Sequence, residues 1–169
     1  MTEELVMAGT GAMADGSAAA ARVFTVGGWS DVAIARHQAR RLAREHGIEP
    51  RRAGEVAIVV SELASNIVKY GVRGEIAIHV TAIAAGEMEL TVVAQDVGPR
   101  IRDLATALRD GHDDRGPIDA AAMAQRGGTG NGLGAVARLA DRLEVREMEG
   151  GKQIIATFSR GLAQGAPSP

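Results

Sequence analysis

The stretch PRRAGEVAIVVSELASNIVKY, residues 50–70, contains the strongest helical signal in the sequence. Its apolar residues recur three or four positions apart: Val56, Val59, Val60, Leu63 and Ile67. This spacing places them on one face of an α-helix. Pro50 suits the first turn, where its missing N–H leaves no hydrogen bond unmade, and Gly71 ends the pattern. We therefore predict an amphipathic helix over Pro50–Tyr70.

Two polar residues interrupt this predicted helix. Glu62 and Asn66 lie four residues apart, so both project from one face. Asn is unfavourable inside a helix because its side chain competes for backbone hydrogen bonds. Its amide oxygen is a hard, neutral ligand that suits Mg²⁺, and a carboxylate one turn away can orient or deprotonate an attacking hydroxyl. A solvated polar face explains the same pair, so the pair alone leaves both interpretations open.

The segments that follow the helix have the pattern of strands. Apolar and polar residues alternate over residues 75–83, and residues 88–95 continue after a turn at residues 85–86. Alternation is typical of a sheet with one buried face, and a short turn joins antiparallel neighbours. We predict an antiparallel hairpin over these residues.

The remaining elements follow from periodicity and capping. A first helix ends near His46, with Ser30 or Asp31 as its N-cap. Because the predicted strands come in adjacent pairs, we predict an α+β fold, a two-layer sandwich with a mostly antiparallel sheet and helices on one face. The other elements are a strand at residues 22–26, helices at 102–109 and 133–140, and strands at 143–147 and 153–159.

Composition and charge narrow the classes of function. We predict one domain over residues 22–160, between flexible tails at residues 1–21 and 161–169. The absence of cysteine excludes disulfides and thiolate metal sites, and a net charge of −2 lacks the basic excess of a nucleic-acid binder. No apolar run reaches the roughly eighteen residues of a membrane span, and no signal peptide is recognisable, so we expect a cytoplasmic protein.

A second polar position closes the second strand of the hairpin. Asp96 ends the apolar run and precedes Gly98 and Pro99. A carboxylate at a strand end can accept a hydrogen bond from an amino group such as that of adenine, and the glycine lets a flat ring approach the backbone. A plain Asp-x-Gly-Pro turn accounts for the same residues.

A glycine-rich segment, GGTGNGLG at residues 127–134, leads into the helix at residues 133–140. Its backbone N–H groups can surround phosphates, with the positive end of the helix dipole behind them. It lacks the lysine of a P-loop, and no βαβ unit precedes it, so a dinucleotide-dependent dehydrogenase is disfavoured. A hinge loop is the plain alternative. The long connection at residues 110–130 has the length of a lid.

In this order, the three segments resemble the histidine-kinase-like ATPase superfamily with its Bergerat ATP-binding fold. Within it, they resemble the anti-sigma and stressosome-switch serine kinases. SELASNIVKY at residues 61–70 is similar to the family's Asn-bearing helix, and DVGPRI at residues 96–101 is similar to its Asp-x-Gly-x-Gly box. Residues 128–134 resemble its second glycine box, and Gly151 stands where a Gly-Thr pair closes the site. The sequence NIVKY at residues 66–70 favours the stressosome-type switch kinase over the direct anti-sigma factor.

The resemblance implies a role for each site residue. Glu62 would act as the base toward a serine or threonine hydroxyl of a partner, and Asn66 would hold Mg²⁺ against the ATP phosphates. Asp96 would contact the adenine amino group. The other residues implied to bind the nucleotide are Lys69, Gly98, Ile101, Gly128, Thr129, Gly130, Gly132, Leu133 and Gly134. Phosphoryl transfer depends mainly on positioning and charge neutralisation, so few polar residues suffice.

The resemblance also implies partners. The chain would be an ATP-dependent protein serine/threonine kinase that acts as a partner switch in stress or sigma-factor regulation. Its substrate would be a STAS-domain antagonist or scaffold protein. A PP2C-type phosphatase or a sigma factor would be a second partner, and a homodimer is left open.

Two residues depart from the family pattern. Arg100 occupies the second glycine of the Asp-x-Gly-x-Gly box, where its side chain can contact phosphate or obstruct closure of the lid. Lys152 replaces the usual Thr after Gly151. Both changes leave a second function open: a regulatory module, with or without nucleotide, that sequesters a sigma factor or activates a phosphatase. A histidine kinase fragment is disfavoured, because the first helix is too short and too rich in Arg to be a dimerisation helix bearing a phospho-accepting His.

Overall fold

The computed structural model describes residues 18–84, 87–109, 112–113, 116–117 and 132–160. Within these ranges the fold consists of one sheet, three longer helices and a few short elements. In chain order the elements are β1 (Ala18–Val26), α1 (Trp29–Glu45), α2 (Pro50–Tyr70), β2 (Gly74–Ala84), β3 (Glu87–Asp96), α3 (Leu104–Ala107), β4 (His112–Asp113), β5 (Gly116–Pro117), α5 (Gly132–Leu139), β6 (Arg142–Met148) and β7 (Gly151–Arg160).

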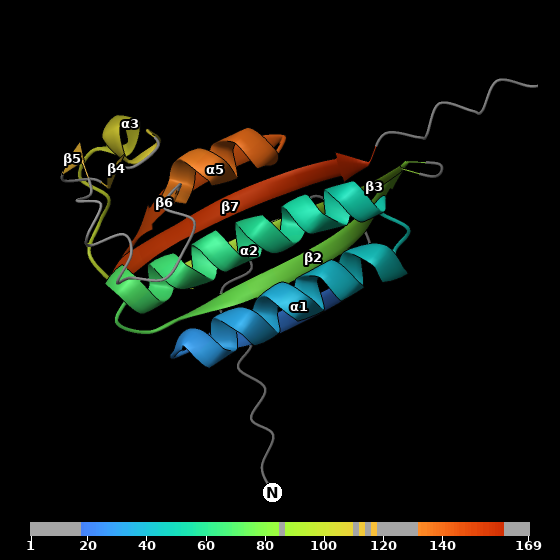
Figure 1. The fold of residues 1–169 in the computed structure, drawn as a ribbon, viewed down its shortest axis with the longest axis horizontal. Helices are drawn as coiled ribbons and strands as arrows, with labels where there is room; N and C mark the ends of the chain where they lie inside the picture. The colour runs from blue at the N-terminus through green and yellow to red at the C-terminus, as the bar shows by residue number, and fades with distance from the viewer. Residues whose placement is uncertain (1–17, 85–86, 110–111, 114–115, 118–131, 161–169) are drawn as a thin grey trace, which may run out of the picture.

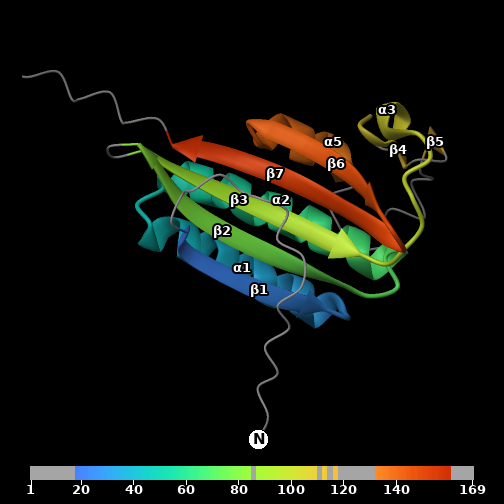
Figure 2. The same ribbon diagram turned by 180° about the vertical axis from the view of Figure 1, so that it is seen from behind.

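The main sheet has the strand order β1-β2-β3-β7-β6, and each neighbouring pair is antiparallel. Strands β4 and β5 pair with each other in a separate two-stranded sheet. Helices α1, α2 and α5 lie side by side on one face of the main sheet, as the two opposite views show (Figure 1, Figure 2). The predicted two-layer α+β sandwich with an antiparallel sheet is therefore confirmed.

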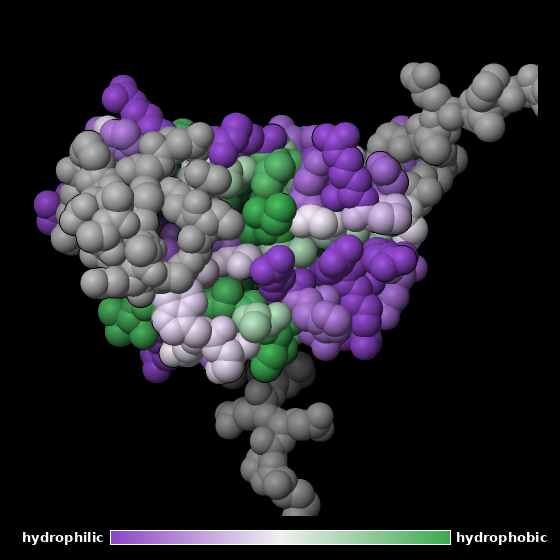
Figure 3. Space-filling view, in the orientation of Figure 1, coloured by the Kyte–Doolittle hydropathy of each residue, from purple (hydrophilic) through white to green (hydrophobic). Residues whose placement is uncertain are grey.

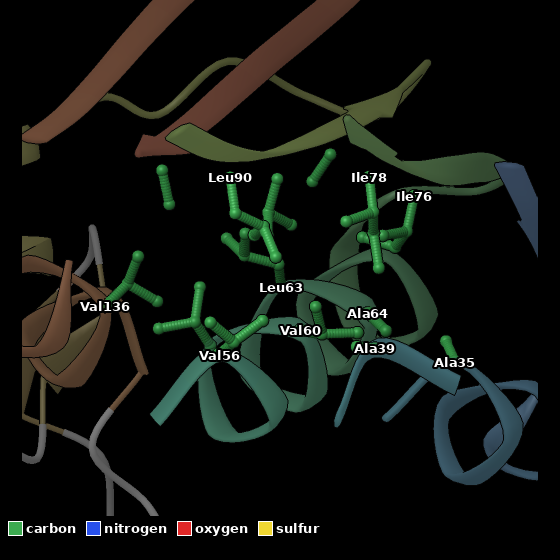
Figure 4. Close-up of a cluster of buried hydrophobic side chains, with 14 of the residues drawn as sticks. Ala35, Ala39, Val56, Val60, Leu63, Ala64, Ile76, Ile78, Leu90 and Val136 are labelled. Carbon is green, nitrogen blue, oxygen red and sulfur yellow. The ribbon is translucent and has the colours of Figure 1, made fainter. Parts of the chain in front are cut away.

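The core between the two layers is aliphatic (Figure 4). The apolar face of α2 packs on the helix-facing side of β2 and β3. Helix α1 contributes Val32, Ala35, Ala39, Leu42 and Ala43. Strand alternation explains the register, because every second residue of β2 turns toward the helices. The fully buried side chains are Val56, Val59, Val60, Leu63, Ile76, Ile78, Val80, Leu90, Val92, Val136 and others. Burying each large aliphatic side chain contributes roughly 1.5–3 kcal/mol.

The start of α1 differs from the prediction. The N-cap is Gly28, not Ser30 or Asp31. Asp31 stands inside the first turn, and its Oδ2 accepts hydrogen bonds from the N–H groups of Gly27 and Gly28, both at 2.9 Å. Helix starts leave N–H groups without partners, and a carboxylate three residues into the helix satisfies them as well as an N-cap side chain does.

Two other elements differ most in length from the prediction. Strand β1 begins at Ala18 instead of residue 22, and the helix predicted over residues 102–109 is reduced to Leu104–Ala107. Asp103 caps this short helix, accepting hydrogen bonds from Thr106 Oγ1 at 2.7 Å and from Thr106 N at 3.0 Å. These hydrogen bonds lower the pKa of the exposed Asp103 carboxyl. The turn at residues 85–86, the tail residues 1–17 and 161–169, and most of the predicted lid lie outside the described residues.

Arg52 joins α2 to the far end of α5 and to the sheet. Its guanidinium donates to the backbone oxygen of Leu139 at 2.6 Å and to Glu55 at 2.7 Å, and it forms an ion pair with Asp141. It also lies over the buried ring of Phe158, 4.9 Å from the centroid. Partial burial on its own lowers the pKa of Arg52, but the hydrogen bonds to the two carboxylates outweigh it and raise that pKa.

Replacing Arg52 with Met is expected to lower the free energy of unfolding by about 2 kcal/mol, because charge-assisted hydrogen bonds to partly buried groups are lost. Urea unfolding followed by circular dichroism measures this. The matched control is Arg51→Met, since the Arg51 side chain is 84% exposed and pairs with Glu55 at 3.3 Å. The control should cost less than about 0.5 kcal/mol. Equal losses of unfolding free energy in the two variants would contradict the role of Arg52 in joining α2 to α5 and the sheet.

Within the described ranges, no helix is long and apolar enough to cross a membrane. The helix-covered side of the molecule is a mosaic of hydrophilic and hydrophobic surface (Figure 3). Hydrophilic residues gather at the end where α1 stops and α2 starts. The candidate site lies at the opposite end.

Candidate functional site

Four elements bring the predicted site residues to one end of the molecule. Helix α2 and strand β3 end there, and β2 and β7 begin there (Figure 1, Figure 2). Antiparallel pairing sets Asp96, the last residue of β3, opposite Gly74 on β2 and opposite Lys152 on β7. The sheet register therefore determines which side chains meet Asp96.

Asp96 is buried, with 5% of its surface exposed. Its Oδ1 accepts two hydrogen bonds, from Gly98 N at 2.7 Å and from Lys152 Nζ at 2.8 Å. Its Oδ2 accepts none from the residues that the structure describes. A carboxylate oxygen can accept two hydrogen bonds, so Oδ2 is the acceptor that remains for a ligand donor.

Lys152 is as buried as Asp96, and the two side chains form an ion pair that is 6% and 4% exposed. Its ammonium also donates to the backbone oxygen of Pro99 at 3.0 Å. Burying an ammonium is costly unless a charge partner and hydrogen bonds compensate, and both are present here. The lysine at the usual threonine position is thus part of the site and ties β7 to the turn after β3.

Four glycines pack closely around Asp96. A Cβ built on Gly71 would lie 2.9 Å from Asp96 Cβ, and one on Gly74 would also lie 2.9 Å from Asp96 Cβ. A Cβ on Gly98 would overlap the backbone oxygen of Tyr70, and one on Gly151 would overlap the backbone oxygen of Asp96. Gly98 was expected to let a flat ring approach. In the structure its missing side chain lets the turn pack against the end of α2.

Replacing Gly98 with Ala is expected to destabilise the domain by about 1–3 kcal/mol, because the added methyl group overlaps backbone atoms that cannot move aside easily. The matched control is Gly54→Ala, inside α2, where a Cβ meets nothing within 4 Å. This control should stabilise the helix by about 0.5–1 kcal/mol. Thermal unfolding of both variants tests whether their changes in stability have opposite signs. A neutral or stabilising effect of Gly98→Ala would contradict the close packing of Gly98 against the end of α2.

Glu62 and Asn66 are both on α2, as predicted, four residues apart. Glu62 is 4% exposed, so it is not part of a solvated polar face. Asn66 is half-buried, and its side chain forms no hydrogen bond with the residues for which positions are given. Its amide is therefore available to a ligand. No cluster of three or more acidic, His or Cys side chains that could hold a metal occurs in the described part of the chain.

Three other predicted positions have distinct surroundings. Lys69 Nζ lies 5.7 Å from the centroid of the Trp29 ring, within the range of a cation–π contact. Ile101 is partly buried and packs against the hydrophobic core. Arg100, which was expected either to contact phosphate or to obstruct the lid, forms an exposed ion pair with Glu147 on β6 at 3.0 Å.

The second glycine box is described only at its end. Helix α5 begins at Gly132, whose φ of +49° favours glycine, and continues through Leu133 and Gly134, both buried. The glycine-rich segment thus runs directly into a helix start, as predicted. Gly128, Thr129 and Gly130, and the lid at residues 118–130, lie outside the described residues.

Two contributors to the site were missed by sequence reasoning. Gly71 was interpreted only as the stop of α2, and Gly74 was not singled out, yet both pack against Asp96. The sequence does carry a signal, because Gly71, Gly74, Gly98 and Gly151 flank the ends of three strands. Their convergence depends on the strand order β2-β3-β7, which the sequence pattern does not contain.

Comparisons with known proteins agree with this geometry. Residues 29–158 match the family described as "Histidine kinase-like ATPase domain". The chain is similar to the serine/threonine-protein kinase RsbT of Bacillus subtilis (strain 168), with 32% identity over 120 residues that cover 71% of this chain and 81% of the relative. It shares its fold with a chain in the crystal structure of the SiaB–SiaC complex from Pseudomonas aeruginosa. That match has a TM-score of 0.55 and 17% identity, and it covers 83% of this chain and 89% of the other.

These matches bear out the predicted family and its relation to a serine/threonine-protein kinase. The family match covers the helix with Glu62 and Asn66, the turn after Asp96 and the start of α5. The chain belongs to the histidine kinase-like ATPase domain family.

Proposed function

We propose that this chain is an ATP-dependent protein serine/threonine kinase that acts as a partner switch in stress or sigma-factor regulation. The observation that carries the proposal is the 32% identity to a serine/threonine-protein kinase, together with a buried carboxylate, Glu62, one turn from the free amide of Asn66. A kinase needs a base near the acceptor hydroxyl and a ligand for the phosphate-bound cation, and α2 supplies both residue types.

In this proposal each residue has one role. The Oδ2 atom of Asp96, to which no described residue donates, accepts a hydrogen bond from the amino group of adenine. The amide oxygen of Asn66 binds Mg²⁺, which, when present, neutralises charge on the phosphates. Glu62 takes the proton of the attacking hydroxyl. The hydroxyl oxygen bonds to the γ-phosphorus, and the bond between that phosphorus and ADP breaks.

The remaining predicted residues surround the phosphates. We assign the segment from Gly128 to Gly134 to the phosphate cap, because its end coincides with the start of α5 and a helix start favours anions. Lys69 supplies a positive charge on the same helix as Asn66. Residues 110–130, most of which lie outside the described residues, are assigned as the lid, and the catalytic domain is assigned to residues 22–160.

The substrate in this proposal is a STAS-domain antagonist or scaffold protein. A fold relative was solved as part of a complex of two proteins, SiaB and SiaC, which supports a protein as the substrate. A PP2C-type phosphatase or a sigma factor is the proposed second partner, and such a switch operates in the cytoplasm. Whether two copies of the chain associate is a separate question for size-exclusion chromatography.

Calorimetric titration with ATP, with and without Mg²⁺, tests the nucleotide site. The wild type is expected to bind ATP more tightly when Mg²⁺ is present, and Asn66→Ala should lose most of that difference, because the amide ligand is removed. Asn66→Asp is the informative second variant, since it keeps an oxygen ligand. An Asn66→Ala variant with the same Mg²⁺ dependence as the wild type would refute the metal role.

A second candidate function is favoured by the buried Lys152–Asp96 pair. A lysine at this position is unusual for the family, and a regulatory module without catalysis would tolerate it. The two functions are separated by incubating the chain with radiolabelled ATP and a purified STAS-domain protein. Label on that protein, lost in Glu62→Gln, supports the kinase; tight binding of the partner without label supports the module.

A further inference from the structure

We propose that Lys152 is a specificity-determining residue of the nucleotide site. Its ammonium donates a hydrogen bond to a ring nitrogen of adenine. That nitrogen is next to the amino group from which Asp96 accepts a hydrogen bond. This inference rests on the proposed function, because it requires that the base lies against Asp96. It assigns a direct ligand contact to a position where the family pattern has a threonine.

The first argument is the count of hydrogen bonds at Nζ. A lysine ammonium carries three N–H donors. Two of them are used, one on Asp96 Oδ1 at 2.8 Å and one on Pro99 O at 3.0 Å. No other acceptor among the described residues bonds to Nζ. A buried donor without a partner is costly, so the third N–H is expected to meet a ligand acceptor or water.

The second argument is which oxygen of Asp96 the lysine uses. Lys152 Nζ shares Oδ1 with the backbone N–H of Gly98. The other oxygen, Oδ2, receives no hydrogen bond from the described chain. The pair therefore leaves one carboxylate oxygen and one ammonium N–H without a partner among the described residues, and the counter-ion keeps the carboxylate in place.

The third argument is the chemistry of the base. In adenine the exocyclic amino group, a donor, stands between two ring nitrogens, N1 and N7, which are both acceptors. An adjacent acceptor and donor on the protein match an adjacent donor and acceptor on this edge. A lone carboxylate can bond only to the amino group. Lys152 would add a charge-assisted hydrogen bond, which is stronger than a neutral one.

The test uses analogues of ATP in which one ring nitrogen is replaced by carbon. Wild-type protein is titrated with Mg²⁺ and ATP, 1-deaza-ATP, 7-deaza-ATP or 3-deaza-ATP. Removing the nitrogen that Lys152 contacts, N1 or N7, should weaken binding about 10-fold, which corresponds to one charge-assisted hydrogen bond. The 3-deaza analogue is the control, because its altered atom lies on the other edge of the base and should cost less than about 2-fold.

Lysine variants assign the effect to this residue. In Lys152→Met, ATP should bind about 10-fold more weakly, and the penalty for the sensitive deaza analogue should disappear. Arg100→Met is the matched control, because it removes a positive charge from the same turn, where Arg100 pairs with exposed Glu147. The control should keep the wild-type ranking of the analogues.

The outcomes separate this inference from the proposed function. ATP binding with equal affinity for ATP, 1-deaza-ATP and 7-deaza-ATP would overturn the role of Lys152 and leave the kinase proposal standing. Tighter binding of GTP than of ATP would overturn the assignment to adenine. No binding of ATP by folded wild-type protein would defeat the proposed function and the contact together. If Lys152→Met fails to fold, the analogue series on the wild type still decides.

Discussion

Replacing Asp96 with Ala is expected to lower the free energy of unfolding by about 3–5 kcal/mol, because the ammonium of Lys152 is then buried without its counter-ion. Gly98 N also loses its acceptor. A loss of this size is a large share of the stability of a domain of ordinary size. Urea unfolding, with the slope checked for two-state behaviour, measures it.

A double variant shows whether the loss comes from the unpaired charge. Asp96→Ala combined with Lys152→Met should recover much of the stability, since a buried ion pair can be replaced by apolar side chains at little cost. The control is Glu147→Ala, which breaks the exposed pair with Arg100 and should cost less than about 1 kcal/mol. A loss below about 1 kcal/mol for Asp96→Ala itself would show that the buried pair contributes little.

The second large effect is expected at Glu62. Glu62→Gln should lower the rate of phosphoryl transfer to a STAS-domain protein by about 10²–10⁴-fold, because the amide cannot accept the proton of the attacking hydroxyl. The affinity for ATP should change little, since Glu62 is not among the residues proposed to contact the nucleotide. Single-turnover kinetics at saturating ATP separate the rate of transfer from binding.

Glu55→Gln is the matched control for this experiment. It makes the same chemical change near the other end of the same helix, where Glu55 pairs with Arg51 and Arg52. It should reduce stability slightly and leave the transfer rate unchanged. Because Glu62 is buried, the unfolding midpoint of Glu62→Gln must be measured as well. A folded Glu62→Gln variant that transfers phosphate within about 10-fold of the wild type would remove Glu62 from the role of base.

Local patterns in the sequence determined most elements of the fold. The period of apolar residues in Pro50–Tyr70 predicted α2 with its observed bounds, because both a face of regular spacing and a proline start are local properties. The alternation in β2 likewise predicted which residues face the helices. The start of α1 was predicted less well. A carboxylate such as Asp31 can bond to the N–H groups at a helix start either as the N-cap or from inside the first turn.

The candidate site divides in the same way. Glu62 and Asn66 were predicted together because four residues of helix place two side chains on one face, whatever the rest of the chain does. Asp96 was predicted as a strand-end carboxylate from its neighbours in the chain. The structure adds a contact that the sequence did not predict, since Arg100 pairs with Glu147 on β6.

By itself, then, the sequence determined the helices, the hairpin, the family and the polar residues of α2, since these depend on spacing along the chain. Only the tertiary structure decided what Lys152 does. Lys152 and Asp96 are 56 residues apart, and their pairing follows from the position of β7 beside β3. A buried charge acquires its partner through sheet register and packing, so its role becomes visible only when distant strands are side by side.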